Sequence, residues 1–143
     1  MRILISACLL GCACRYDGGG KPCEKALALA GRHTVVPVCP EQLGGLPTPR
    51  PPAEIQGDRV INRLGRDVTA PYQRGAREAM HLYRLLRCDA AILKARSPSC
   101  GCGQVYDGTF SGALVPGDGV TAAYLKENGV QVLTEEDPWP FDP

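Results

Sequence analysis

The sequence predicts an α/β protein: a small open parallel sheet of about four strands with helices on both faces, plus a small β-hairpin insertion. Short apolar segments suited to buried strands alternate along the chain with segments suited to helices, and this alternation is typical of parallel sheets joined by right-handed crossovers. The length of 143 residues suits one domain. We therefore expect residues 1–143 to form a single domain, in which residues 138–143 are a flexible or surface-docked tail.

Four segments have the apolar or β-branched character of buried strands, and they are residues 2–7, 34–38, 89–95 and 130–133. The first segment is too short to span a bilayer, and the Gly- and Cys-containing stretch behind it does not suit a signal peptide. We therefore expect a cytoplasmic protein that has no membrane segment. With right-handed crossovers, the expected strand order is 2-1-3-4, which is a Rossmann-like arrangement.

Three segments suit helices. Residues 24–30 are rich in Ala and Leu, and Gly31 ends this helix. A long helix has Thr69 as its N-cap and Pro71 in its first turn. Its apolar face is formed by residues three or four positions apart, which are Tyr72, Ala76, Ala79, Tyr83 and Leu86. The last helix covers roughly residues 118–128 and is closed by Gly129.

The hairpin insertion lies between the second and third strands. Residues 54–56 and 59–62 flank a Gly-Asp pair that suits a tight turn. A further short hairpin is expected in residues 104–113, around Asp107 and Gly108. Residues 42–53 hold so many Gly and Pro that we expect neither a helix nor a central strand there.

The net charge of +1 argues against a broad nucleic-acid surface, because phosphate binding needs many uncompensated Lys and Arg side chains. A tRNA partner is not favoured, although it stays possible if basic residues cluster locally, as Arg63, Arg66, Arg74 and Arg77 could. These arginines could equally form a solvated helix face. The charge is compatible with a small-molecule substrate.

The eight cysteines are the most informative feature of the chain. Cys8 and Cys39 end the first two strands, and Cys100 follows the third in a Ser- and Pro-rich loop. The carboxyl ends of parallel strands meet at one edge of a sheet, where ligands bind. We therefore expect these three thiols to converge. Cys88 begins its strand and belongs to the opposite edge as a core thiol, and Cys23 has a structural role at a helix start.

Converging thiolates select soft metals: zinc, copper(I) or an iron–sulfur cluster. Structural zinc sites usually use Cys-x2-Cys pairs, and this chain has none; its close pairs are Cys12 with Cys14 and Cys100 with Cys102. Single cysteines on separate strand ends suit a cluster better, because its irons are spread over a cube. Spacing alone leaves zinc and redox or purely structural thiols open as alternatives.

Short motifs are spread along nearly the whole chain. In order they are SACLLG at 6–11, CRYDG at 14–18, VCPEQLGGLPTPR at 38–50, DVT at 67–69, Lys94, SPSCG at 97–101 and YDGTF at 106–110. Together they closely resemble the thiouracil desulfidase (TudS) family. The resemblance implies a 4Fe–4S cluster that is held by three cysteines and keeps one iron open for a thiocarbonyl sulfur. Water would add to the pyrimidine ring carbon and sulfur would leave as hydrosulfide, without a net redox change.

Carried onto this chain, the resemblance implies the ligands Cys8, Cys39 and Cys100. Glu41 would activate water or move protons, and Ser97 would assist at the substrate. The implied substrate is a small thiopyrimidine or thionucleotide. Each of these roles has a purely structural alternative: Glu41 could be a solvated loop carboxylate, and Ser97 could merely close a turn.

Other residues of these motifs are candidates of lower rank. Cys14 is the main competitor as third ligand. Tyr16 could stack on a pyrimidine, Asp17 could contact substrate or pair with Arg50 to brace the loops, and Lys94 could offset thiolate charge or lie at the surface. The competing function is a non-catalytic module that binds or carries a metal or an iron–sulfur cluster.

Overall fold

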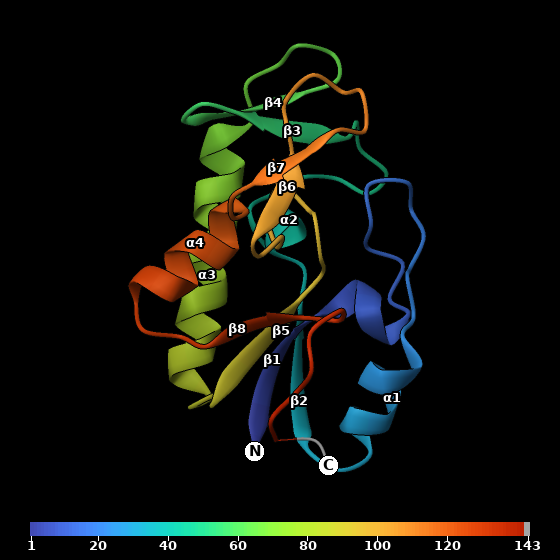
Figure 1. Cartoon of the computed structure of the whole chain (residues 1–143), viewed down its shortest axis with the longest axis vertical. Helices are drawn as coiled ribbons and strands as arrows, with labels where there is room; N and C mark the ends of the chain where they lie inside the picture. The colour runs from blue at the N-terminus through green and yellow to red at the C-terminus, as the bar shows by residue number, and fades with distance from the viewer. Residues whose placement is uncertain (142–143) are drawn as a thin grey trace.

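A four-stranded parallel sheet forms the centre of the molecule (Figure 1). The structure is a computed structural model that describes residues 1–141. The sheet has the order β2-β1-β5-β8, and its strands are β1 (Arg2–Ser6), β2 (Thr34–Val38), β5 (Ala90–Leu93) and β8 (Val132–Thr134). In chain order this is the expected 2-1-3-4 arrangement, so the predicted fold class is confirmed.

Successive side chains of the central strands point to opposite faces of the sheet, so the core is divided into two clusters, one on each face. Leu4 of β1 and Leu93 of β5 belong to one buried cluster, whereas Ile3, Ile5 and Ile92 belong to the other. β1 lies inside the sheet, paired with β2 on one side and with β5 on the other, and its side chains are buried on both faces. A strand that is buried on both faces is apolar at nearly every position. This explains why these strands could be recognised in the sequence.

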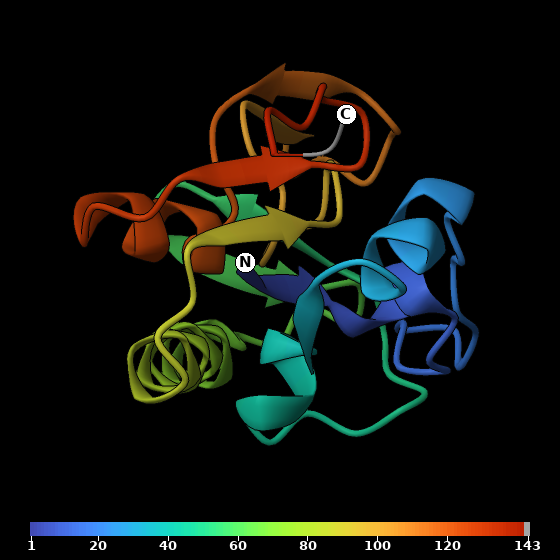
Figure 2. The ribbon, with the colours of Figure 1, turned by 90° about the horizontal axis from the view of Figure 1, so that it is seen from below.

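Helices cover both faces of the sheet, as Figures 1 and 2 show. The helices α3 (Thr69–Leu85) and α4 (Val120–Glu127) lie on the face of Leu4, and α1 (Glu24–Ala30) lies on the face of Ile3. Two short turns follow the first two strands: the 3-10 turn η1 (Ala7–Leu10) and the helical turn α2 (Pro40–Leu43). Among the described residues, no helix has the length and apolar character needed to cross a membrane.

Two antiparallel hairpins lie beyond the carboxyl ends of the parallel strands (Figure 1). They pair β3 (Ala53–Gln56) with β4 (Arg59–Asn62), and β6 (Gln104–Tyr106) with β7 (Leu114–Pro116). The first is the predicted hairpin. The second differs from the prediction, since its strands are joined by residues 107–113 rather than by a tight turn at Asp107 and Gly108. The loop is wide because its backbone N–H groups bond to the side chains of Asp107 and Glu54.

Several predicted element ends were wrong. Residue 7 belongs to η1, and α2 extends into the segment that was expected to hold no helix. Thr69 is not the N-cap: Val68 occupies that position, while the Thr69 hydroxyl accepts a bond from the Val60 N–H at 2.8 Å. Leu86 lies past the end of α3 and is 39% exposed, so it is not part of the buried helix face.

The chain end docks on the face of α1, which is the second of the two alternatives for the tail. Trp139 is only 4% exposed, and its indole Nε1 donates to the carbonyl of Thr134 at 3.0 Å. The ammonium of Lys25 lies 4.0 Å from the centre of the indole ring. A buried tryptophan with a satisfied N–H fixes the chain around it. Residues 142 and 143 of the predicted tail lie outside the described residues.

Candidate active site

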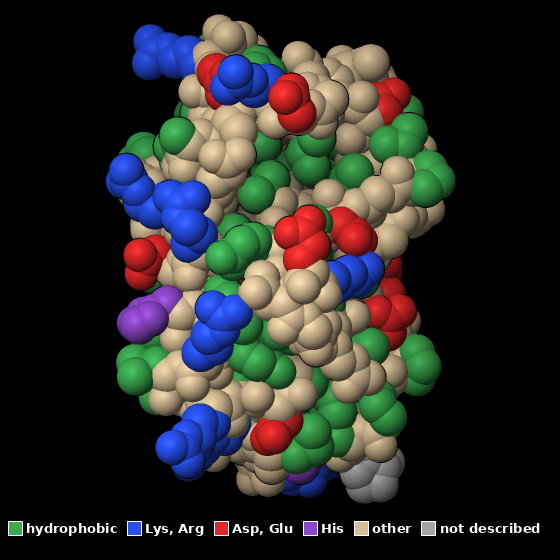
Figure 3. Space-filling view, turned by 90° about the vertical axis from the view of Figure 1, so that its left-hand side faces the viewer, with side chains coloured by type: hydrophobic (Ala, Val, Ile, Leu, Met, Phe, Trp, Pro, Cys, Tyr) green, Lys and Arg blue, Asp and Glu red, His purple; other side chains and the backbone are tan. Residues whose placement is uncertain are grey.

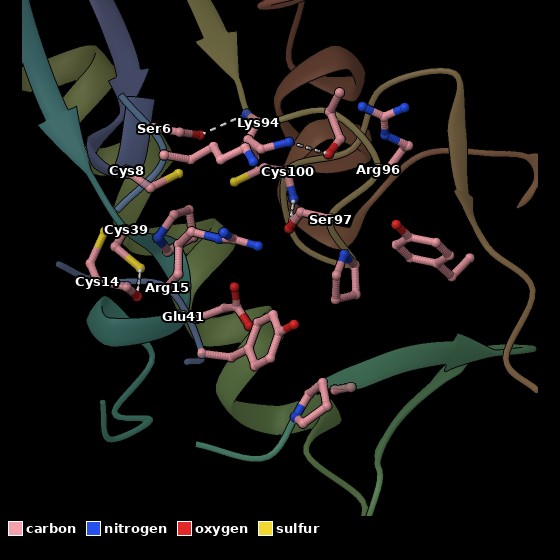
Figure 4. A pocket seen from close by; sticks show the side chains of 18 of the residues that line it. Ser6, Cys8, Cys14, Arg15, Cys39, Glu41, Lys94, Arg96, Ser97 and Cys100 are labelled. Atoms are coloured by element: carbon pink, nitrogen blue, oxygen red, sulfur yellow. Dashed lines mark hydrogen bonds between the residues drawn. The ribbon is translucent and has the colours of Figure 1, made fainter. Parts of the chain in front are cut away.

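A cavity of about 610 Å³ lies at the carboxyl ends of the parallel strands, between the sheet and the two hairpins. Its lining includes the thiols of Cys8, Cys39 and Cys100 and the side chains of Glu41 and Ser97. Figure 4 shows Cys8 and Cys100 on the side next to Ser6 and Lys94, Cys39 beside Cys14, and the Glu41 carboxylate facing the same space. The predicted convergence of thiols from three strand ends is therefore present.

Local structure after each strand positions these thiols. Cys8 lies in η1, which turns the chain directly after β1, and Cys39 lies between β2 and α2. Cys100 lies in the loop after β5, where Gly119 packs so closely that a Cβ there would meet the Ser99 carbonyl oxygen at 2.5 Å. Cys8 and Cys100 are 8% and 5% exposed, and Cys39 is half-buried. All eight cysteines are free thiols.

Electrostatics also places these thiols near one another. Burial raises the pKa of Cys8 to about 11; Lys94 opposes this shift and Cys39 adds to it. Burial raises the pKa of Cys14 to about 12, with contributions from Cys39 and Cys8. The pKa of Cys100 is also raised, chiefly by burial, although the Ser6 hydroxyl favours its thiolate. The raised pKa values of Cys8, Cys14 and Cys100 keep these three thiols protonated near neutral pH, so a soft metal that binds them must displace protons.

Cys14 lies in the same cavity, as the sequence left open. It is 5% exposed, and its carbonyl accepts a bond from the Cys39 thiol at 3.6 Å. The other four cysteines lie elsewhere: Cys12 is exposed, Cys23 is the N-cap residue of α1, Cys102 bonds to the Val132 carbonyl, and Cys88 is in the core. Within the described residues, no three His, Cys, Asp or Glu side chains are arranged to hold one metal ion. Four thiols thus share one cavity without meeting at one point.

Glu41 is held from two sides by residues whose role the sequence did not reveal. The hydroxyl of Tyr72 in α3 donates to Glu41 Oε1, and the guanidinium of Arg50 pairs with Oε2 at 3.5 Å. Burial raises the pKa of Tyr72, and the nearby Glu41 carboxylate raises it further, so Tyr72 remains a donor. Sequence periodicity identified Tyr72 only as part of an apolar helix face. Glu41 is thus an anchored carboxylate in the cavity rather than a solvated loop residue.

Two glycines allow α2 to reach Tyr72. A Cβ at Gly44 would lie 1.9 Å from the Pro71 carbonyl oxygen, and a Cβ at Gly75 would lie 1.9 Å from the Pro40 carbonyl oxygen. The backbones of α2 and α3 therefore touch, which is possible only where side chains are absent. Gly44 and Gly75 are visible in the sequence, but a glycine does not by itself indicate which segments approach each other.

Ser97 closes the turn that presents Cys100, which is the structural role that the sequence offered as the alternative to a role at the substrate. Its Oγ accepts the N–H of Ser99 at 3.1 Å and the N–H of Cys100 at 3.0 Å. A hydroxyl has two acceptor positions and one donor. Both acceptor positions of Ser97 are used, so toward the cavity this hydroxyl can only donate.

The lower-ranked candidates have different outcomes. Lys94 lines the cavity, but its Nζ pairs with Glu135 at 2.9 Å. Tyr16 lines the cavity and is 40% exposed. Asp17 is not among the lining residues: its carboxylate accepts the Gly19 N–H and lies 3.8 Å from Arg15. The alternative in which Asp17 pairs with Arg50 is not realised, because Arg50 turns inward to Glu41 and Asp17 lies beside Arg15.

Glu54 of β3 ties the two hairpins together, a role that no feature of the sequence indicated. It is 9% exposed, and its Oε1 accepts the N–H groups of Gly108 at 3.0 Å and Phe110 at 3.1 Å. Gln56 adds a bond to the Gly108 carbonyl at 2.8 Å. Phe110 adopts the left-handed region with φ of 58°, which is strained for a bulky residue. Glu54 thus fixes a strained loop as a wall of the cavity.

Cationic side chains outnumber carboxylates in the cavity lining, although four of them pair with carboxylates: Arg50 with Glu41, Lys94 with Glu135, Arg96 with Glu136 and Arg15 with Asp17. The lining contains two carboxylates, Glu41 and Glu54, and six cationic side chains: Arg15, Lys21, Arg50, Arg63, Lys94 and Arg96. On the face formed by α3 and α4, by contrast, basic side chains are scattered among acidic and apolar ones (Figure 3). The cavity, rather than this helical face, is where cations gather.

Comparisons with known proteins agree with this geometry. The family model described as 2-thiouracil desulfurase matches residues 3–137. The chain is 43% identical over 145 residues to the uncharacterized protein YbbK of Bacillus subtilis (strain 168), covering 94% of this chain and 96% of that protein. A solved structure of a [4Fe-4S]-dependent thiouracil desulfidase, TudS, superposes with a TM-score of 0.87 at 47% identity, covering 94% of this chain and 91% of that one. This chain therefore belongs to the 2-thiouracil desulfurase family.

Proposed function

We propose that this protein is a 4Fe–4S-dependent desulfidase, which converts a thiolated pyrimidine into its oxygen analogue and hydrosulfide without a net redox change. The observation that carries the proposal is one cavity in which thiols from three strand ends meet an anchored carboxylate and a donor hydroxyl. The family and the similarity to TudS support the same reaction.

The residues in the cavity fit an iron–sulfur cluster. The donor set is all thiol, which is the ligand type that such clusters prefer. The thiols share a cavity but do not surround a point, and a cluster accepts ligands that are spread apart. We propose Cys8, Cys39 and Cys100 as the three ligands. Cys14 is the alternative to Cys39, because the two lie in contact.

When bound, such a cluster supplies an iron that acts as a Lewis acid toward the thiocarbonyl sulfur. The chain's own contribution is proton transfer and orientation. Glu41 is held by Tyr72 and Arg50, and its remaining lone pairs can accept a proton from the water that attacks the ring carbon. General-base catalysis of this kind is worth about 10²–10⁴ in rate.

Ser97 would orient the substrate. Because both of its acceptor positions bond to backbone N–H groups, its partner must be an acceptor. The pyrimidine carbonyl oxygen and the departing sulfur both meet that requirement, whereas a ring N–H does not. Ser97 would therefore bind an acceptor edge of the ring, through either the carbonyl oxygen or the departing sulfur.

The lining of the cavity suits a small thiopyrimidine or a thionucleotide. The ring can pack on Phe110 and Tyr16, which both line the cavity. Lys21 and Arg63, two lining cations outside the ion pairs described above, would favour a substrate that carries a phosphate. A tRNA substrate remains the less favoured alternative, since the basic side chains on the α3–α4 face are scattered.

Anaerobic reconstitution tests the proposal. The loaded protein should show iron–sulfur absorption and convert 2-thiouracil to uracil with release of hydrosulfide. The variants Cys8→Ala, Cys39→Ala and Cys100→Ala should each lose most of the bound iron, while Cys12→Ala, an exposed neighbour outside the cavity, should retain it. Iron loss in Cys14→Ala with retention in Cys39→Ala would replace one ligand by the other. A loaded protein that leaves thiouracil and its nucleotides unchanged would favour the carrier function.

A further inference from the structure

Arg50 is the most deeply buried cation beside the cysteines. It follows the Gly- and Pro-rich loop after α2, and its side chain is only 4% exposed. Its terminal nitrogens have five polar neighbours, which are the Cys14 carbonyl at 2.9 Å, Thr48 Oγ1 at 2.9 Å, the Pro47 carbonyl at 3.2 Å, Glu41 Oε2 at 3.5 Å and Cys39 Sγ at 3.9 Å. One guanidinium therefore contacts both competing cysteine segments and the carboxylate proposed as base.

The remaining nitrogen of this side chain has no partner. Nε of Arg50 is buried and has no hydrogen-bond acceptor among the described residues. Buried hydrogen-bond donors in proteins nearly always have an acceptor. A donor that loses its hydrogen bond to water on burial and gains no other partner destabilises the folded state. An orphan donor on a cation that lines the cavity indicates an acceptor that the polypeptide does not supply.

The chemistry of the surroundings limits what this acceptor can be. Arg50 lines the same cavity as Cys14, Cys39 and Cys100, and one of its terminal nitrogens contacts the Cys14 carbonyl and Cys39 Sγ, so the guanidinium adjoins the sulfur-lined part of the cavity. Sulfur atoms of iron–sulfur clusters accept N–H bonds, and such bonds tune the cluster. Burial lowers the pKa of Arg50, but Glu41 and Cys39 outweigh this effect and raise it above its ordinary value, so the side chain remains a cation.

We infer that Arg50 is a positioning residue of the loaded site: its forked nitrogens hold Cys39 and Glu41 in a fixed relation, and its Nε–H donates to a sulfur of the bound cluster. The inference rests on the proposed function. It differs from a bracing role within the polypeptide, because one of its bonds forms only when the cluster is present. A lysine could retain the charge but not the fork, since it is a single point charge on a flexible stem.

The deciding experiment compares Arg50→Lys with Arg59→Lys. Arg59 is a matched control: it also pairs with a carboxylate, Asp67 at 3.2 Å, but it is 61% exposed and lies outside the cavity lining. Each protein is reconstituted anaerobically, and the rate of iron loss to a chelator is measured without substrate. Removing a partner outside the metal ligands typically weakens metal binding about 10–100-fold. We expect iron loss roughly 10-fold faster in Arg50→Lys and unchanged in Arg59→Lys.

Two further readouts separate this role from simple bracing. The gain in melting temperature on cluster loading should be smaller in Arg50→Lys than in the unaltered protein, because weaker cluster binding reduces that gain, whereas loss of a brace that acts only within the polypeptide lowers both melting temperatures alike. Turnover should fall through kcat, with KM little changed, because Glu41 loses its orientation. The inference would be overturned if Arg50→Lys and Arg59→Lys retained iron equally and showed equal gains in melting temperature on cluster loading. This holds even if the Arg50→Lys apoprotein has a lower melting temperature.

If Arg50→Lys does not fold, an NMR measurement on the unaltered protein tests the inference. With ¹⁵N-labelled arginine, a slowly exchanging Nε–H signal should shift on cluster loading, because Arg50 Nε is shielded from water. The absence of any such shift would overturn the inference. If the unaltered protein takes up no cluster at all, the proposed function fails instead, so the two failures are distinguishable.

Discussion

The two walls of the cavity are held by different kinds of contact. The cysteine wall, made by Cys8, Cys39 and Cys100 with their segments, is fixed by backbone packing, as at Gly44 against Pro71. The hairpin wall, made by β3–β4, β6–β7 and the loop 107–113, is fixed by hydrogen bonds of a few side chains, chiefly Glu54. A change in the cysteine wall disturbs the core, whereas the hairpin wall can be loosened one hydrogen bond at a time.

This difference separates chemistry from recognition. Reacting groups must be held within fractions of an ångström, which packed elements achieve better than loops. A wall that only shapes the substrate side can vary, provided that its tethers persist. We therefore expect changes in the cysteine wall to act on kcat or on stability, and changes in the hairpin wall to act on KM.

The largest effect is expected for Glu41→Gln. Glutamine keeps the shape and can still accept from Tyr72, but it cannot take a proton from water. Cluster content should equal that of the unaltered protein, while kcat should fall by roughly 100-fold or more. Iron analysis beside steady-state kinetics checks this result. A decrease of less than about three-fold would mean that Glu41 only braces the wall and that its proposed chemical role is wrong.

The next effect is expected for Gly75→Ala. In an open helix this change would stabilise the protein by about 1 kcal/mol. Here the new Cβ would lie 1.9 Å from the Pro40 carbonyl oxygen, so α2 must move away from α3. Overpacking of this kind costs about 1–3 kcal/mol or more and should lower the melting temperature by roughly 10 °C.

Gly31→Ala is the matched control for that change. Its Cβ would meet the Ala28 carbonyl oxygen at 3.4 Å, an ordinary contact, and Gly31 has a φ of −78°. Its melting temperature should remain within a few degrees of the unaltered protein. Equal behaviour of the two variants in a thermal melt would show that the α2–α3 approach is not rigid.

A smaller effect is expected for Glu54→Ala. The N–H groups of Gly108 and Phe110 lose their acceptor, and the strained loop is released from the cavity. KM for the thiopyrimidine should rise about 10-fold while kcat changes less, which corresponds to one or two lost hydrogen bonds. Glu54→Gln keeps the Oε1 acceptor and should behave nearly as the unaltered protein. A loss of kcat with unchanged KM would contradict the division between the two walls.

The smallest effect is expected for Gln56→Ala. It removes a single bond from Gln56 Nε2 to the Gly108 carbonyl and leaves Glu54 in place. One neutral hydrogen bond is worth about 1 kcal/mol, so KM should rise no more than about five-fold. A KM effect larger than that of Glu54→Ala, measured in the same assay, would reassign the main tether of the hairpin wall.

The sequence was sufficient for the cysteine wall because its positions follow from strand ends. The apolar runs before Cys8 and Cys39 are continuous since their strands are buried on both faces, and parallel strands bring their carboxyl ends together. That residues 1–143 form a single domain remains a prediction. The choice between Cys14 and Cys39 stayed open because it depends on the path of an irregular loop.

The partners of Glu41 could not be predicted. The ring of Tyr72 satisfies an apolar helix pattern whatever its hydroxyl bonds to, and its partner depends on how closely α2 approaches α3. Arg50 follows a Gly- and Pro-rich segment, where no periodicity indicates direction, so pairing with Asp17 was as reasonable as pairing with Glu41. The Glu54 tether joins two hairpins, and no local signal encodes such a contact.

The docked Trp139 also has a consequence for the order of events during synthesis. Its indole belongs to the same buried cluster as Cys8 and Cys14, at the other end of the chain. Ribosomes add about 5–20 residues per second, so roughly ten seconds pass between the translation of those cysteines and of the tryptophan that completes their core. During that interval the nascent thiols lack their apolar cover, and a thiol-reactive oxidant would reach them more easily than in the finished protein.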